Sequence, residues 1–168
     1  TLYMTKLDFD TYWVLKEEAP ELKSFASNAK TFDARSWYDD ATVDANGNEP
    51  GTKQNPYVIN EAYELYNLAE IVNTGEDNFA NKYIVLGKDI VINSGDSSKW
   101  STSAPAYNFV PIGIDTATGF RGHFNDIGKI KEIKGLYINQ GTSNFGGLFG
   151  SAINATIANI KVTDGYVQ

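Results

Sequence analysis

The sequence predicts a mainly β fold built as a stacked solenoid, and three observations lead to this expectation. First, Ile133-Lys-Gly-Leu-Tyr-Ile138 returns as Ile157-Ala-Asn-Ile-Lys-Val162, with every apolar position recurring at one constant offset. Second, Phe120-Arg-Gly-His-Phe124 returns as Phe145-Gly-Gly-Leu-Phe149 at almost the same offset. Third, both motifs combine glycine with alternating apolar residues, which is typical of one structural unit stacked on the next. We therefore expect rungs of about 24–25 residues, a period that is typical of solenoids.

Composition agrees with a folded chain that is rich in strands and turns. The 168 residues are 42% hydrophobic and 13% aromatic, which suits one domain, or one domain plus a fragment, and argues against disorder. Ten Tyr, nine Phe and 15 Gly favour β-structure with many turns.

Charge and cysteine content exclude several function classes. The net charge of −7 would repel a phosphate backbone, so nucleic acid is not expected as a partner. Without cysteine the chain has no disulfide, no thiolate nucleophile and no Cys-based zinc site. No apolar run is long enough to span a membrane. The start at Thr1, without a signal-peptide pattern, favours a piece of something longer.

The first half of the chain predicts one helix among extended segments. Residues 1–26 show short apolar runs separated by Pro20, which predicts two extended pieces rather than one central strand. Residues 44–51 are dense in turn formers. After a short strand at 57–59, apolar residues recur with helical spacing over about 61–73, with Asn60 as the expected N-cap. Gly75 is the expected left-handed C-terminal cap.

From Tyr83 onward the pattern predicts strands only. Apolar runs at 83–86 and 90–92 precede a polar excursion over 93–108, and a strand resumes at 109–112. Within the repeats, Leu136 and Ile138 are expected to point inwards, with Ile160 and Val162 stacked beside them one rung along.

The glycine-rich stretch Asn144-Phe-Gly-Gly-Leu-Phe-Gly150 resembles the GLUG motif of bacterial surface proteins. Its neighbours extend the resemblance, because Gly51-Thr-Lys-Gln-Asn-Pro-Tyr-Val-Ile59 and the following helix resemble the leading segment of such units. Residues 51–168 are covered almost continuously. One departure is Asn125-Asp-Ile-Gly128, where the family usually has a glycine-rich turn; it puts the tightness of that corner in doubt.

The resemblance implies a right-handed parallel β-helix in large, secreted, modular proteins, with the helix near 61–73 capping one end. It implies a GLUG-type unit over 57–168 that is open at its C-terminal end, preceded by a loop at 46–56. Residues 1–45 resemble the closing strands of a preceding or neighbouring unit. The chain is therefore either cut from a tandem array or joined head to tail with copies of itself.

Head-to-tail joining predicts an interface between the first strands of one chain and the last rung of the next. The candidate interface residues are Trp13, Val14, Leu15, Leu22, Phe25, Ile157, Ile160 and Val162.

Catalytic and metal chemistry is not expected. Asp89, Asp115 and Asp126 could serve a sugar-cleaving β-helix, but they share no register and suit turns or corners. His123 is the only histidine, so the paired histidines of a zinc peptidase are missing. A weak Ca²⁺ site at Asp44, Asn46 and Asn48 is the alternative to a solvated turn, since later positions of a calcium loop do not match.

A patch of aromatic residues is the candidate ligand-binding surface, and its members are Tyr38, Trp100, Tyr107 and Tyr137. Such rings stack on sugars or form protein contacts; the alternative is packing under the 93–108 excursion. The sequence thus predicts a non-catalytic extracellular structural or adhesion module of a bacterial surface protein, with host or cell-wall glycan or protein as a further partner. The alternative is a non-catalytic or carbohydrate-binding part of a larger secreted polysaccharide-active enzyme or metalloprotease.

Overall fold

The computed structural model describes residues 13–15, 20–22, 34–139, 141 and 146–168, which fall into two compact units. Within the first unit, Thr1–Asp33, strand β1 (Trp13–Leu15) pairs antiparallel with β2 (Pro20–Leu22). Leu15 lies opposite Pro20, so the proline is the first residue of the second strand. Two short strands thus take the place of one central strand, as the proline predicts.

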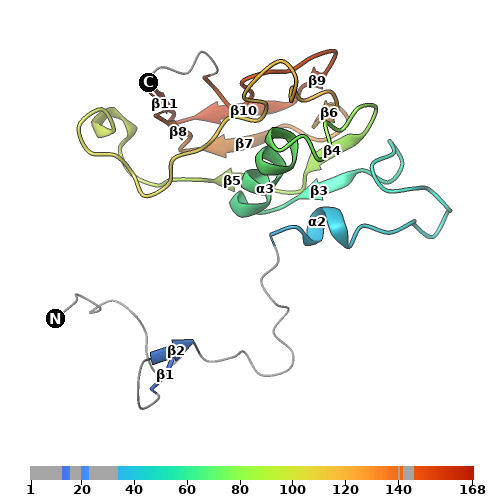
Figure 1. The fold of residues 1–168 in the computed structure, drawn as a ribbon, viewed down its shortest axis with the longest axis horizontal. Helices are drawn as coiled ribbons and strands as arrows, with labels where there is room; N and C mark the ends of the chain where they lie inside the picture. Colours follow the sequence, from blue (N-terminus) through green and yellow to red (C-terminus); the bar gives the residue numbers. More distant parts are fainter. Residues whose placement is uncertain (1–12, 16–19, 23–33, 140, 142–145) are drawn as a thin grey trace. The chain divides into compact units, whose positions relative to one another are not determined.

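The second unit, Ala34–Gln168, contains two α-helices, one 3₁₀ turn and nine short strands among its described residues (Figure 1). In chain order these are α2 (Ser36–Asp39), β3 (Tyr57–Ile59), α3 (Ala62–Asn73), β4 (Tyr83–Leu86), β5 (Ile90–Val91), η1 (Ser97–Lys99), β6 (His123–Phe124), β7 (Lys131–Lys134), β8 (Tyr137–Ile138), β9 (Thr156–Ile157), β10 (Ile160–Thr163) and β11 (Tyr166–Val167).

All described strand pairs of the second unit are parallel. Four strands pair in the order β3-β4-β6-β9, three in the order β5-β7-β10, and two as β8-β11. Each sheet therefore grows in chain order, and β9, β10 and β11 are the last strands. Figure 1 shows β3 at the lower side of this unit and β9 and β10 at the upper side.

The prediction of a right-handed parallel β-helix with a regular rung length is wrong. The described strands are short and lie in small separate sheets. The repeat predicts that Ile133 lies beside Ile157, but its parallel partner is Val162. The partner of Phe124 is Ile157 instead of Phe149.

The repeated motifs misled because each spans a corner rather than one strand. In the first motif, Gly135 at φ +78° separates β7 from β8. In the second, Asn159 at φ +53° separates β9 from β10. These are different corners, so similar apolar spacing does not mark equivalent positions. The structural counterpart of Asn159 is Asn125, at φ +54° between β6 and β7.

The corner at Asn125 is tight, although it lacks the glycine-rich turn of the GLUG units that the sequence resembles. The Asn125 side chain is fully buried and accepts a hydrogen bond from the backbone N–H of Leu86 at 3.2 Å. It donates to the carbonyls of Lys129 at 3.0 Å and Asn159 at 2.7 Å. A Cβ on Gly128 would lie 2.0 Å from the Asn125 Oδ1, so glycine is needed there. The asparagine thus joins three successive segments.

Helix α3 is confirmed close to its predicted bounds. It begins one residue later than the sequence predicts, with Glu61 rather than Asn60 as the N-cap. The Glu64 carboxylate accepts hydrogen bonds from the backbone N–H groups of both residues. Gly75 at φ +75° follows the C-terminal end, as predicted. The helix links the parallel strands β3 and β4, where a crossover connection is required, rather than capping a stack.

The core of this unit is aromatic and aliphatic. Fully buried rings come from segments far apart in the chain: Phe79, Phe109, Phe120 and Phe124. Phe120 contacts Phe79 and Phe124 with centroid separations of 6.2 and 6.4 Å. The inner side of α3 completes the same cluster. Each such ring contributes roughly 2–3 kcal/mol of transfer free energy.

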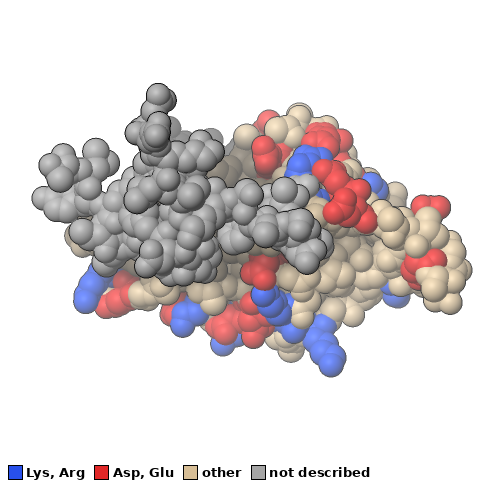
Figure 2. Space-filling view, turned by 90° about the horizontal axis from the view of Figure 1, so that it is seen from below, with Lys and Arg blue, Asp and Glu red and all other residues tan. Residues whose placement is uncertain are grey.

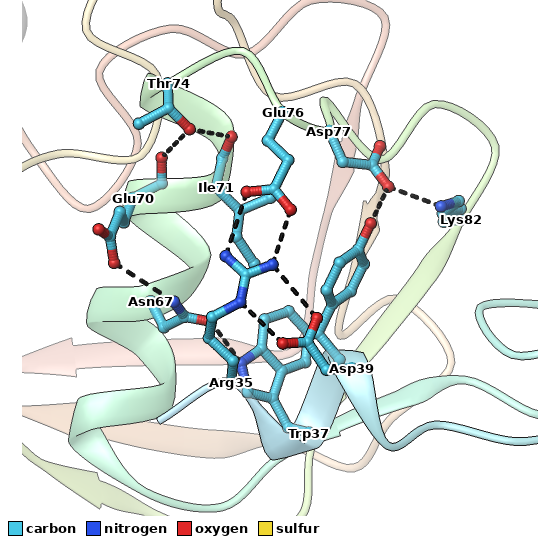
Figure 3. A network of polar contacts seen from close by, with 11 residues as sticks. Arg35, Trp37, Asp39, Asn67, Glu70, Ile71, Thr74, Glu76, Asp77 and Lys82 are labelled. Atoms are coloured by element: carbon cyan, nitrogen blue, oxygen red, sulfur yellow. Dashed lines mark hydrogen bonds and ion pairs between the residues drawn. The ribbon is translucent and has the colours of Figure 1, made fainter. Parts of the chain in front are cut away.

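A network of polar contacts holds α2 against the end of α3 (Figure 3). The Arg35 guanidinium binds Asp39 and Glu76, with closest separations of 2.9 and 2.6 Å. Trp37 is buried, and its Nε1 donates to the Asn67 side chain at 3.1 Å. Residues 34–45 therefore belong to the second unit through buried contacts as well as ion pairs.

Asp77 is the centre of the neighbouring contacts. Its carboxylate accepts from Tyr38 at 3.0 Å, from Lys82 at 2.6 Å and from the Phe79 N–H at 2.7 Å. Burial on its own would raise the Asp77 pKa, but the hydrogen bonds from these donors outweigh it and lower the pKa. The ionised form is therefore the one that the fold stabilises.

We expect Asp77→Asn to lower the free energy of unfolding by about 1–3 kcal/mol at pH 7, because three donors lose an ionised acceptor. A carboxylate with a depressed folded pKa contributes stability above its unfolded pKa of about 4, which is lost as pH falls through the lower folded value. The difference between variant and parent should therefore shrink below about pH 4. Urea midpoints at pH 7 and pH 3 measure this, with the exposed Asp40→Asn as control. An equal deficit at both pH values would contradict it.

Candidate functional site

The last strands of the second unit form an exposed edge, here called the C-terminal edge and defined as residues 156–167. Strands β9, β10 and β11 bond to β6, β7 and β8 on one side, and no other described strand pairs with their second side. Three apolar side chains there are well exposed, with fractions of 37% for Ile157, 43% for Val162 and 53% for Val167. Free backbone groups beside apolar side chains are the features that an added strand recognises.

Ion pairs tie this edge to the strand before it. Lys134 binds Asp164 at 3.0 Å, which raises the lysine pKa, and Lys161 lies 3.6 Å from Glu132. Figure 2 looks from below, toward the β3 side of the unit, and shows acidic and basic side chains interspersed where the surface is not grey.

The predicted interface residues fall in both units. Ile157, Ile160 and Val162 lie on the C-terminal edge, where Ile160 also packs against the core. In the first unit, the other members are in the hairpin strands β1 and β2, namely Trp13, Val14, Leu15 and Leu22. Phe25 lies outside the described residues.

The four predicted ligand-binding aromatics do not form one surface. Trp100 and Tyr137 are each only 5% exposed and contact edge to face at 6.0 Å. They pack under the 93–108 excursion, so their faces are not offered to a ligand. Tyr38 belongs to the α2 cluster around Asp77. Tyr107 is 61% exposed and is the member that remains on the surface.

Tyr107 instead lines a hollow that the sequence reasoning missed, here called the tyrosine groove. Its walls are Tyr63 and Tyr66 of α3, Val91 and Ile92 beside them, and Tyr107 of the excursion. The hollow measures about 400 Å³. The signal in the sequence was the pair of tyrosines three residues apart on α3, which places both rings on one helix side. What faces them is set by the return of the excursion, which no local pattern predicts.

The three candidate acids lie in separate turns. Asp89 accepts the Glu132 N–H at 2.8 Å, and Asp115 accepts the Thr118 N–H at 2.6 Å. Asp126 lies 3.0 Å from His123 Nδ1, and the histidine ring stacks on Tyr83 at 4.2 Å. The structure thus gives each carboxylate a local partner and does not bring the three together.

The Asp44 loop is organised by its own hydrogen bonds. The carboxylate accepts the backbone N–H groups of Asn46 at 2.8 Å and Asn48 at 2.9 Å, and also the Asn48 amide at 2.8 Å. These bonds lower the Asp44 pKa, with the Asn48 side chain the largest cause. In the part of the chain that the structure describes, no group of three or more His, Asp or Glu side chains is placed to hold a metal ion.

Comparison with known proteins gives a partial similarity. Over 129 residues, 76% of this chain, the sequence is 33% identical to a protein of Evansella cellulosilytica that carries the provisional name Gly-rich membrane protein. The chain spans 13% of that protein's length. No family model and no solved structure matches the chain. Among the helices of the described residues, none is both long and apolar enough to cross a bilayer.

Proposed function

We propose that this chain is a non-catalytic structural and adhesion module of a bacterial surface protein, which joins head to tail with copies of itself or with neighbouring repeats. The observation that supports this most is the C-terminal edge, where three sheets end together with apolar side chains exposed. The resemblance of residues 144–150 to the GLUG motif, partly outside the described residues, points the same way. The name of the similar protein supports a place in the cell envelope, and an extracellular position belongs to the proposal.

The proposed joint is strand addition. The hairpin strands of one chain would lie along β9, β10 or β11 of the next and satisfy the free backbone groups of that edge. Exposed Ile157, Val162 and Val167 would then be covered, which supplies the apolar part of the contact. Because the hairpin and the edge lie in different parts of the chain, the contact is heterologous, and it extends from copy to copy into a rod unless its rotation closes a ring.

We expect the intact chain to associate with increasing concentration, and Val162→Lys to weaken this association by at least about tenfold. A lysine at this edge position places a solvated charge where the partner strand must approach. Ile130→Lys is the matched control, since Ile130 is 74% exposed and lies outside the edge strands. Sedimentation velocity gives the masses, and electron micrographs show whether rods form. A parent chain that stays monomeric at every concentration, or equal association of Val162→Lys and parent, would refute head-to-tail joining.

A further inference from the structure

The tyrosine groove continues beyond its central hollow in both directions. Val91 and Ile92 also border a second hollow, which runs under the excursion past Trp100 and Pro105. At the opposite end, Tyr63 and Val91 border a third hollow that reaches Lys88. Because Val91 borders all three hollows, we treat them as one groove that begins beside α3 and continues beside the 93–108 excursion. Such a shape suits a chain-like ligand rather than a compact one.

One polar atom of the lining residues has no partner among the described residues. The Tyr66 hydroxyl is buried and makes no hydrogen bond with them, although its ring is held edge to face against Phe109 at 5.0 Å. Burial, with a smaller effect of Tyr107, raises the pKa of Tyr66 to about 12. The phenol is therefore a protonated donor at neutral pH. A buried hydroxyl without a partner is unfavourable, and a ligand acceptor would recover the lost hydrogen bond.

The rest of the groove wall selects for a neutral ligand. Lys88 at the far end is paired with Glu61, and Asp89 keeps its negative charge while it accepts the Glu132 N–H, so this end does not favour an anionic ligand. The middle is formed by tyrosine rings and the apolar side chains Val91 and Ile92. A sugar has an apolar ring face and hydroxyl groups around its edge. Tyrosine rings can stack on the ring face, and tyrosine hydroxyls can form hydrogen bonds with the sugar hydroxyls.

Tyr107 forms a wall of the groove whose side chain can change rotamer while its backbone stays in place. Its backbone is fixed by Asn93, whose side chain accepts the Tyr107 N–H at 3.0 Å and donates to the Tyr107 carbonyl at 2.8 Å. Its side chain is 61% exposed and so has room to change rotamer. We propose that the tyrosine groove binds a neutral, linear polysaccharide chain, with one sugar ring stacked on Tyr107 and a sugar oxygen accepting the Tyr66 hydroxyl after the Tyr107 ring turns aside. This binding is independent of head-to-tail joining.

Calorimetric titration of the intact chain with hexamers of β-1,4-linked glucose, xylose, mannose and N-acetylglucosamine tests the proposal, with polygalacturonate as the charged comparator. We expect at least one neutral hexamer to bind and polygalacturonate not to bind. Tyr107→Ala should weaken that binding about tenfold through lost stacking, and Tyr66→Phe by about threefold to tenfold through one lost hydrogen bond. Ile130→Ser, an exposed apolar position outside the groove, should leave it unchanged.

A stability measurement separates binding from structure. Because the Tyr66 hydroxyl has no partner in the free chain, Tyr66→Phe should keep or raise the melting temperature while weakening sugar binding. Failure of every neutral hexamer to bind overturns the proposal, as does unchanged binding by both tyrosine variants. Sedimentation of the same samples reports joining separately, so either proposal can fail without the other.

Discussion

Gly135→Ala is expected to lose more than about 4 kcal/mol of unfolding free energy, enough to abolish stable folding of residues 34–168. A Cβ at this position would lie 1.9 Å from the carbonyl oxygen of Asn93, and 2.7 and 2.8 Å from its C and N atoms. These are backbone atoms, and Asn93 is itself buried and bonded to the Gly135 carbonyl at 3.0 Å, so neither side has room to move. The φ of +78° adds strain for any L side chain.

Gly47→Ala is the matched control for this change. Gly47 has nearly the same φ, +82°, but a Cβ there would meet nothing within 4 Å. Its cost should be only about 1–2 kcal/mol, the penalty of the left-handed conformation alone. Urea unfolding followed by circular dichroism measures both variants. Similar losses for the two would show that the contact with Asn93 is relieved and that the clash argument fails.

Asn125→Ala is expected to cost about 3–5 kcal/mol, the second large effect. Alanine leaves the Leu86 N–H and the carbonyls of Lys129 and Asn159 without the partner that joins them. All of this occurs at a fully buried position, so water cannot substitute. The left-handed φ of +54° makes alanine less favourable still.

Asn154→Ala isolates the conformational part of that cost. Asn154 has a φ of +53° but is exposed, so its replacement should lose about 1 kcal/mol. Thermal and urea unfolding of both variants give the comparison. If Asn125→Ala is no worse than Asn154→Ala, the buried amide does not hold the three segments together.

Local sequence patterns predicted the helix and the turns, but they could not predict which strands pair with each other. Helix α3 could be predicted because its apolar spacing, its acidic first turn and Gly75 all act within one segment. Strand register could not be predicted, because it is fixed by the left-handed corners at Asn125 and Asn159. In the sequence, an asparagine at such a corner cannot be distinguished from any other loop asparagine. The apolar repeat is therefore present in the sequence, but the residues that it makes equivalent are not the residues that pair in the structure.

For the candidate sites too, local patterns were informative and long-range contacts could not be predicted. Trp100 and Tyr137 were predicted as possible ligand-binding rings, with packing under the 93–108 excursion as the alternative. Both are buried and in edge-to-face contact, as the alternative predicts. Tyr63 and Tyr66 gave only a weak helical signal, since the wall opposite them comes from residues 91–107. At the C-terminal edge, alternation predicted both Ile160 and Val162 as inward residues. Ile160 does pack against the core, but Val162 is 43% exposed and lies beside Ile133 instead of Ile138.

The chain-order growth of the sheets has a consequence for how the molecule is made. Each later strand lies on the strand formed before it, from β3 through β4 and β6 to β9, and from β5 through β7 to β10. A nascent chain can therefore complete every hydrogen-bonded layer with residues already synthesised, without waiting for its C-terminus. We therefore expect the layers to form in the order in which their strands are synthesised.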